Sequence, residues 1–123
     1  MSKLSKNFSA HEFACKCGCG FGTNEEDVSQ NLIDLLEFMR VYTGPIHINS
    51  GCRCEKWNEA INGSPVSAHT KGNAADIRTL GSKERFKAVS AACLAGCLRI
   101  GIGDTYIHVD VDPDLPKRVI WLY

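Results

Sequence analysis

Two metal-binding residue types, His69 and Asp76, stand seven positions apart in the segment Ser67–Ile77. His69 offers an imidazole nitrogen and Asp76 a carboxylate oxygen, and zinc accepts both kinds of ligand in proteins. Between them, Gly72 and Asn73 predict a turn, because both residue types tolerate a positive φ. The chain can therefore place His69 before the turn and return Asp76 beside it on a strand. A catalytic zinc is usually held by three protein ligands, so one more ligand has to come from elsewhere.

The best candidate for the third ligand lies in the segment Tyr106–Asp112, where apolar and polar residues alternate strictly. This alternation predicts a strand with three branched aliphatic residues on one face and tyrosine, histidine and two aspartates on the other. Solvent-facing strands more often carry threonine, lysine, glutamate or serine, so a face of histidine and carboxylates is unusual. His108 completes a set with His69 and Asp76. A fourth zinc position then stays open for water, the usual layout of a catalytic site.

The spacing of these residues resembles that of the zinc peptidases of the D-Ala-D-Ala carboxypeptidase group, which is related to lysostaphin-type enzymes and to the hedgehog signalling domain. The motif that carries the resemblance is Ser67-x-His69-x-x-Gly72-x-Ala74-x-Asp76, followed later by His108-x-Asp110. The resemblance extends to Ile48–Arg53, to Asn58 and to the cysteine-rich stretch Phe13–Cys19. It therefore covers nearly the whole chain.

The resemblance implies that His69, Asp76 and His108 bind zinc and that the substrate is a peptidoglycan stem peptide. In such enzymes the arginine of the turn that corresponds to Ile48–Arg53 faces the active site. A planar guanidinium at Arg53 can pair with a carboxylate or support a developing oxyanion. The alternative for Arg53 is an ordinary surface arginine.

The general base is the position at which this chain departs from the pattern. Several relatives carry a glutamate three residues before the last zinc histidine, and here that residue is Thr105, which is not a base at neutral pH. Three carboxylates are near in sequence: Asp104 at a predicted hairpin turn, and Asp110 and Asp112 on the same strand face as His108. Asp110 is the nearer of the last two, so it could accept a proton from water or orient His108. We predict Asp110 as the base, with Asp104 second.

Five of the seven cysteines form two clusters. Cys15, Cys17 and Cys19 alternate with lysine and glycine, and Cys52 and Cys54 flank an arginine. Residues two apart are poorly placed for a disulfide, and an odd cysteine count without a signal sequence favours thiols in reducing surroundings. The thiolates of Cys15, Cys17, Cys19 and Cys54 could hold a second, structural zinc. Buried free thiols, or one disulfide from the first cluster to Cys52 or Cys54, are the alternatives.

Charge and hydropathy exclude several classes of partner. Lys+Arg and Asp+Glu number 14 each, so nothing indicates nucleic acid or an anionic membrane surface. The sequence has no run of about 18 apolar residues, so no membrane span is expected. The N-terminal residues are polar and lack the apolar core of a secretory signal. We expect a monomer. The lack of a signal predicts that it is made in the cytoplasm, and the family resemblance implies that it then reaches the cell wall by an export or phage-borne route.

The periodicity of the chain predicts an α+β fold for residues 1–123 as one domain, with residues 1–27 as a Cys-rich N-terminal segment packed on it. Neither a linker nor a composition break divides the chain. Helices are predicted over residues 29–42, 54–61 and 82–97, and strands over 46–49, 98–102, 105–111 and 118–122, besides the one that carries Asp76. Helices grouped on a mostly antiparallel sheet define the class, as the resemblance to hedgehog and D-Ala-D-Ala peptidase domains also implies.

Within the helix predicted over residues 82–97, Ser82 is expected to cap the N-terminus. The expected apolar face consists of Phe86, Val89, Ala92 and Cys93. Cys93 and Cys97 lie four residues apart on this helix and are predicted to be small core residues.

Together these features predict a zinc-dependent peptidase that hydrolyses peptide bonds of bacterial peptidoglycan, with a phage endolysin-like origin expected by analogy. The motifs do not distinguish a D-Ala carboxypeptidase from an endopeptidase, because the two differ in pocket shape and in recognition of a free carboxylate. The alternative is a catalytically silent zinc domain that binds a cell-wall or protein partner. The presence of both Asp110 and Arg53 favours the enzyme.

Overall fold

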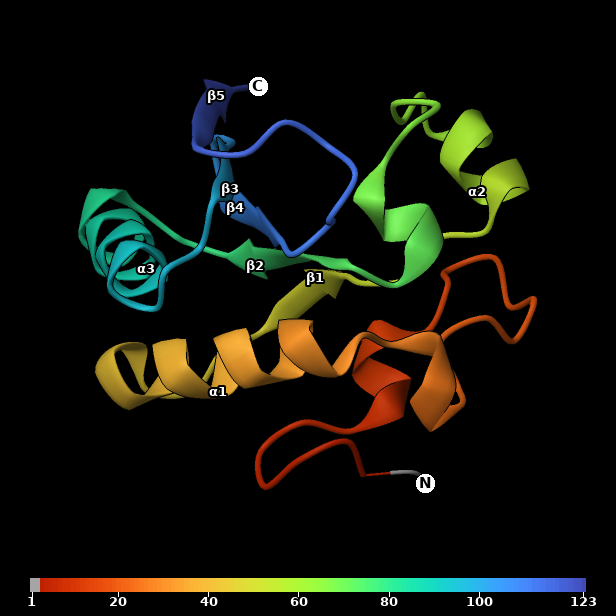
Figure 1. The fold of residues 1–123 in the computed structure, drawn as a ribbon, viewed down its shortest axis with the longest axis horizontal. Helices are drawn as coiled ribbons and strands as arrows, with labels where there is room; N and C mark the ends of the chain where they lie inside the picture. Colours follow the sequence, from red (N-terminus) through yellow and green to blue (C-terminus); the bar gives the residue numbers. More distant parts are fainter. Residues whose placement is uncertain (1–2) are drawn as a thin grey trace.

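Five strands form one sheet in the computed structural model, which describes residues 3–123 (Figure 1). They are β1 (Ile48–Ser50), β2 (Ala74–Arg78), β3 (Arg99–Ile102), β4 (Tyr106–Asp110) and β5 (Val119–Leu122). Their order in the sheet is β1-β2-β4-β3-β5. Only the β3–β5 pair is parallel, and the other pairs are antiparallel. The prediction of a mostly antiparallel sheet in an α+β domain is therefore confirmed.

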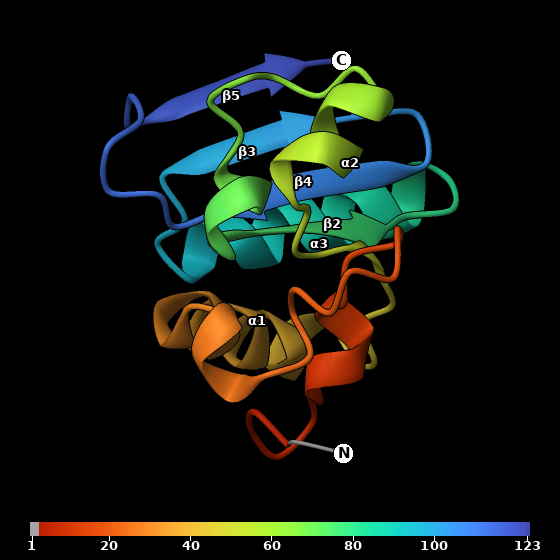
Figure 2. The ribbon, with the colours of Figure 1, turned by 90° about the vertical axis from the view of Figure 1, so that its right-hand side faces the viewer.

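Within residues 3–123, three α-helices pack around this sheet: α1 (Gln30–Thr43), α2 (Glu55–Ala60) and α3 (Ser82–Leu94). Figure 2 shows α2 in front of the sheet and α3 behind it. The longest helix, α1, follows Ser29 as its N-cap and ends at Gly44, whose φ of 74° lies in the region that glycine adopts without strain. The predicted position of this helix, over residues 29–42, is confirmed to within one residue.

The hydrophobic core joins α1, α3 and the sheet into one cluster. The buried stripe of α1 consists of Leu32, Ile33, Leu35, Leu36 and Met39, as its sequence periodicity predicts. Ile77, Ile107 and Val109 face this stripe from β2 and β4. Phe8 and Phe13 are also fully buried, so the segment before α1 belongs to the same core. Each large apolar side chain buried in this way contributes about 1.5–3 kcal/mol.

The predicted apolar face of α3 is confirmed for Ala92, which is buried, and for Val89, which packs against the core, but it is wrong for Phe86 and Cys93. Phe86 is 75% exposed and Cys93 is exposed as well, although Cys97 is partly buried against the core. The face that packs on α1 is made of small residues, Ala88, Ala91 and Ala92, with Ala95 next to them. These alanines follow the i, i+3, i+4, i+7 spacing of a helix face, and their small size lets two helices approach closely. The N-cap is Gly81 instead of Ser82, which is the first helical residue.

Among the described residues, none of the helices is long and apolar enough to cross a membrane.

Candidate metal centre

The centre of the polar site is one cross-strand row of the sheet. The strand register pairs Ser50 with Asp76, Asp76 with His108, His108 with Gly101, and Gly101 with Trp121. Directly paired side chains on antiparallel strands have Cβ atoms about 5 Å apart. The alternation that turns the aliphatic residues of β2 and β4 into the core turns Asp76 and His108 together to the opposite face. The sheet itself therefore brings the carboxylate and one imidazole into contact.

His69 reaches this row from a short 3-10 helix, Ala68–Lys71, which the predicted turn joins to β2. The turn depends on Gly72, which has a φ of 73° and forms the left-handed C-cap of this helix. A Cβ atom at that position would lie 1.9 Å from the carbonyl oxygen of Asp27, so no larger residue fits. The His69 side chain is only 2% exposed. The predicted turn, which brings the side chains of His69 and Asp76 next to each other, is therefore confirmed.

The three predicted ligand residues meet at one point. His69 Nε2 and His108 Nδ1 each lie 3.2 Å from Asp76 Oδ1. All three donor atoms lie within 4.8 Å of one another, and all three residues are buried. A tetrahedral zinc with bonds of about 2.05 Å separates its ligand atoms by about 3.3 Å. The spacing of the donor atoms therefore fits a zinc ion.

Outer hydrogen bonds fix which nitrogen of each ring faces the centre. His69 Nδ1 lies 2.6 Å from the carbonyl oxygen of Gly51, and His108 Nε2 lies 2.6 Å from Asp110 Oδ2. Both partners can only accept, so each ring places its N–H outward. In neutral rings the inner nitrogens then direct lone pairs at the Asp76 carboxylate, which is repulsive unless a cation lies between them. The donor set thus fits a metal ion, and the outer partners orient its ligands.

The pKa shifts of Asp76 and His108 show how a proton and a metal ion would compete for this centre. Burial raises the pKa of Asp76, but hydrogen bonds with His108 and His69 together lower it by more. The net pKa of this carboxyl group therefore lies well below its usual range. Burial lowers the pKa of His108, whereas hydrogen bonds to Asp110 and Asp76 raise it, and the net pKa is above its ordinary value. Protons on the imidazoles compete with a cation for the same nitrogens, so metal affinity should fall as the pH is lowered.

Arg53 lies directly beside the three ligand residues. Its Nη2 donates to Asp76 Oδ2 at 3.0 Å, its Nε to Ser50 Oγ at 3.1 Å and its Nη1 to Asn58 Oδ1 at 3.4 Å. Its side chain is 13% exposed, so the guanidinium is held in place and still reaches the surface of the site. A guanidinium has five N–H groups, so about two stay available for another partner. The sequence predicted Arg53 as a site residue, but its hydrogen bonds to Ser50 and Asn58 become visible only in the folded structure.

Asp110 lies on the far side of the His108 ring from Asp76. Besides His108 Nε2, its oxygens accept from Arg99 Nε at 2.8 and 3.0 Å and from the backbone N–H of Asp112 at 3.1 Å. Its side chain is fully buried. Sequence reasoning missed Arg99, although a single arginine at the start of an otherwise apolar strand is a signal of a buried partner.

The other two carboxylates considered for proton transfer have different surroundings. Asp104 is exposed, as is Thr105, in the turn between β3 and β4. Asp112 is buried and pairs with Lys71, whose Nζ lies 3.0 Å from Asp112 Oδ2. The structure thus groups Arg53 and Asp110 with the three ligand residues and directs Asp112 to a lysine.

A groove of about 430 Å³ opens beside His108. Trp121 and Tyr123 form one wall, and Val66, Ser67 and Leu115 line other parts of it. The ring of Trp121 lies 5.3 Å from that of His108, between centroids, and the guanidinium carbon of Arg99 lies 5.0 Å from the Trp121 ring. The sequence analysis did not select these aromatic residues, because their position beside His108 depends on the parallel pairing of β5 with β3.

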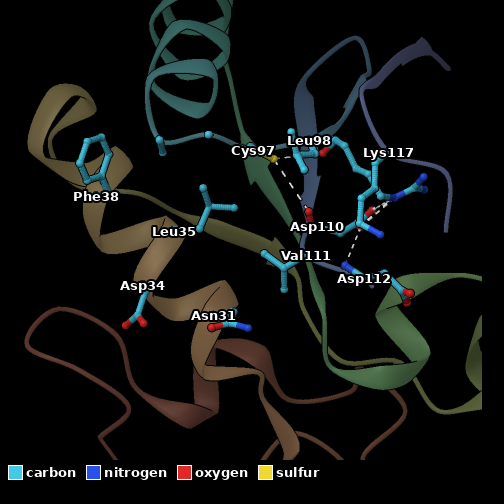
Figure 3. A pocket seen from close by; sticks show the side chains of 13 residues that line it. Asn31, Asp34, Leu35, Phe38, Cys97, Leu98, Asp110, Val111, Asp112 and Lys117 are labelled. Carbon is cyan, nitrogen blue, oxygen red and sulfur yellow. Dashed lines mark hydrogen bonds and ion pairs between the residues drawn. The ribbon is translucent and has the colours of Figure 1, made fainter. Parts of the chain in front are cut away.

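A second pocket, of about 410 Å³, lies between α1 and the ends of β3 and β4. Figure 3 shows Leu35 and Phe38 of α1 on one side of it and Val111 and Lys117 on the other. Arg99 and Asp110 line both pockets, and none of the three predicted ligand residues lines this one. The groove beside His108 is therefore the pocket that borders the candidate metal centre.

Two imidazoles and a carboxylate around one point, next to a groove, are the donor set of a mononuclear zinc hydrolase. The chain matches the family model described as Peptidase M15 over residues 6–110 and belongs to this family of zinc-dependent D-Ala-D-Ala carboxypeptidases. The resemblance drawn from the sequence is thereby confirmed, and the chain is a metallopeptidase by family. No curated protein gives a significant match. The matched region ends at Asp110, so β5 with Trp121 lies outside it.

The geometry predicts the effect of removing two ligands. The double variant His69→Ala/His108→Ala should lose one equivalent of bound zinc, because a single carboxylate does not hold the ion at neutral pH. Elemental analysis of the dialysed protein measures this loss, and circular dichroism serves as the control for folding. A folded double variant with the metal content of the wild type would contradict the assignment.

Proposed function

We propose that the protein is a zinc-dependent peptidase that hydrolyses peptide bonds of bacterial peptidoglycan stem peptides. The observation that carries this proposal is the convergence of His69, Asp76 and His108 on one point, with Arg53 beside them. These three residues would hold the zinc. When bound, the zinc lowers the pKa of a water molecule and polarises the carbonyl group of the scissile bond.

Arg53 would stabilise negative charge that forms on the substrate. Its guanidinium is already fixed by Asp76, Ser50 and Asn58, so little reorganisation is needed when charge develops on a carbonyl oxygen. The same fork could instead pair with the terminal carboxylate of a substrate, as a carboxypeptidase requires. Either role needs a planar group with several N–H donors at this position.

Asp110 would act through His108 as a positioning residue. Both of its oxygens accept hydrogen bonds, and it contacts the ring nitrogen that faces away from Asp76. Such a carboxylate fixes the ring orientation and the position of its proton, and it increases the basicity of the inner nitrogen. The alternative from the sequence, in which Asp110 is the general base, is separated from this role by the experiment on Asp110 below.

The groove next to His108 supports a peptide as the substrate. It combines the apolar faces of Trp121, Val66 and Leu115 with the hydroxyl groups of Ser64 and Ser67. A surface of this kind can bury the methyl groups of alanine residues and still bond to a peptide backbone.

The function is tested by digestion of purified peptidoglycan with the zinc-loaded protein, with and without chelator. We expect release of soluble products only without chelator, and no release by His69→Ala/His108→Ala. Mass spectrometry of the products separates two outcomes. A carboxypeptidase releases free D-Ala, whereas an endopeptidase releases cut stem peptides. A folded, zinc-loaded protein that releases nothing would contradict the proposal and support a catalytically silent zinc domain.

Replacement of Arg53 tests its part in the reaction. Arg53→Lys should lower the turnover of peptidoglycan fragments by about 10²–10³-fold, the scale of one lost oxyanion donor, while zinc content is unchanged. A lysine keeps the charge but lacks the planar fork. Arg78→Lys, at an exposed arginine of β2, is the matched control and should behave like the wild type. Equal activity of both variants would make Arg53 a structural residue only.

Asp110→Asn separates positioning from proton transfer. If Asp110 acts through His108, zinc affinity falls by about 10–100-fold, and saturating zinc restores most of the activity. A loss of at least about 100-fold in kcat that persists at saturating zinc would identify Asp110 as the base. Asp104→Asn is the control, and we expect it to keep wild-type activity. Inactive Asp104→Asn together with active Asp110→Asn would assign the base to the turn.

A further inference from the structure

Four thiols gather at a second place in the molecule, apart from the histidines. Cys15, Cys17, Cys19 and Cys54 have their sulfur atoms within 4.8 Å of one another. Cys15 Sγ lies 3.5 Å from Cys17 Sγ, and Cys17 Sγ lies 3.6 Å from Cys54 Sγ. A tetrahedral zinc with Zn–S bonds of about 2.3 Å separates its sulfur ligands by about 3.8 Å. The two sulfur–sulfur distances are thus close to the edge length of such a tetrahedron.

We propose that Cys15, Cys17, Cys19 and Cys54 bind a structural zinc ion that ties the N-terminal segment to the turn carrying Arg53. Thiolates are soft ligands that select zinc over magnesium or calcium, and four of them close the coordination sphere of the ion. This second zinc would leave no position for water, so it stabilises the fold without taking part in hydrolysis.

The local backbone is shaped to bring these thiols together. Gly18 and Gly20, between and after the last two cysteines of the loop, have φ values of 80° and 96°. This conformation curls the loop so that side chains two residues apart converge, and the N–H of Gly18 donates to the carbonyl oxygen of Cys15 at 3.2 Å. No atom would obstruct a Cβ at either glycine, so the backbone conformation is what requires glycine at these positions.

Backbone N–H groups also point at two of the sulfur atoms. The N–H of Cys54 donates to Cys15 Sγ at 3.4 Å, and the N–H of Trp57 donates to Cys54 Sγ at 3.4 Å. Such outer hydrogen bonds fix the positions of two of the sulfur atoms, as the outer partners of metal ligands do.

The other three cysteines lie in different surroundings and do not join this cluster. The grouping of four thiols is therefore a feature of one place in the fold and not a result of the high cysteine content. Cys52 is buried and donates from its Sγ to the carbonyl oxygen of Asp27. Cys97 donates to the carbonyl oxygen of Arg99, and Cys93 is exposed on α3. The two sulfur separations given above also exceed the bond length of a disulfide, about 2.05 Å.

The proposed zinc would join segments that support the candidate metal centre. Cys54 directly follows Arg53 and is the N-cap of α2. The N–H of Cys52 donates to the carbonyl oxygen of Phe13 at 2.8 Å, so the loop and the turn are already side by side. A closed metal clamp at Cys54 would reduce the freedom of this turn and thereby of the Arg53 backbone.

The first experiment counts metal without measuring activity, so its result does not depend on the peptidase proposal. The wild type should contain about two zinc ions, and His69→Ala/His108→Ala about one. Loading this double variant with Co²⁺ should give the near-ultraviolet charge-transfer absorption of cobalt thiolates. Adding Cys17→Ser/Cys19→Ser should remove both the metal and the absorption, whereas adding Cys93→Ser should change neither. A metal-free histidine variant, or cobalt without thiolate absorption, would overturn the proposal.

The second experiment uses the unmodified chain, because a cysteine variant could fail to fold. The protein is alkylated with iodoacetamide in the presence of a phosphine reductant that excludes disulfides, and modified sites are mapped by mass spectrometry. Cys17, Cys19 and Cys93 are all exposed, so burial does not explain a difference in their reactivity. With zinc bound, Cys93 should react at least about tenfold faster than Cys17 and Cys19, and chelator should remove this difference. Equal rates in the zinc-loaded protein would overturn the proposal.

Discussion

The site depends on one buried carboxylate, that of Asp76, which three basic side chains share. Its Oδ1 atom faces His69 and His108, and its Oδ2 atom accepts from Arg53. Burying this charge is costly. The Arg53 guanidinium offsets part of the cost, and a cation between the carboxylate and the imidazoles, whether a proton or a metal ion, is needed to offset the rest. The orientation of both imidazoles and of the guanidinium therefore follows from where β2 places a single side chain.

A second layer of contacts makes this arrangement rigid, and it comes from elements that also build the core. The carbonyl oxygen that orients His69 belongs to Gly51, and a Cβ atom there would lie 2.7 Å from Phe13 Cα. Phe13 is fully buried, so the N-terminal segment is pressed against the turn that supports His69. Packing of the core and geometry of the site are thus coupled through a contact that only glycine allows.

The groove owes its shape to the last strand, which lies beyond the residues matched by the family model. Gly101 stands between His108 and Trp121 in the cross-strand row, and a Cβ at Gly101 would lie 2.7 Å from the Trp121 indole. The missing side chain leaves the indole free to lie over β3 and approach the imidazole.

The sequence by itself determined the three candidate ligand residues and most of the elements, because these depend on short-range patterns. The spacing of His69 and Asp76 around a glycine turn, and the alternation around His108, are local signals that the backbone obeys. Tertiary structure alone decided that Arg99 binds Asp110, that Trp121 lies beside His108 and that the alanine face of α3 points inward. Each of these depends on which strands or helices become neighbours, and local periodicity in the chain does not specify those neighbours.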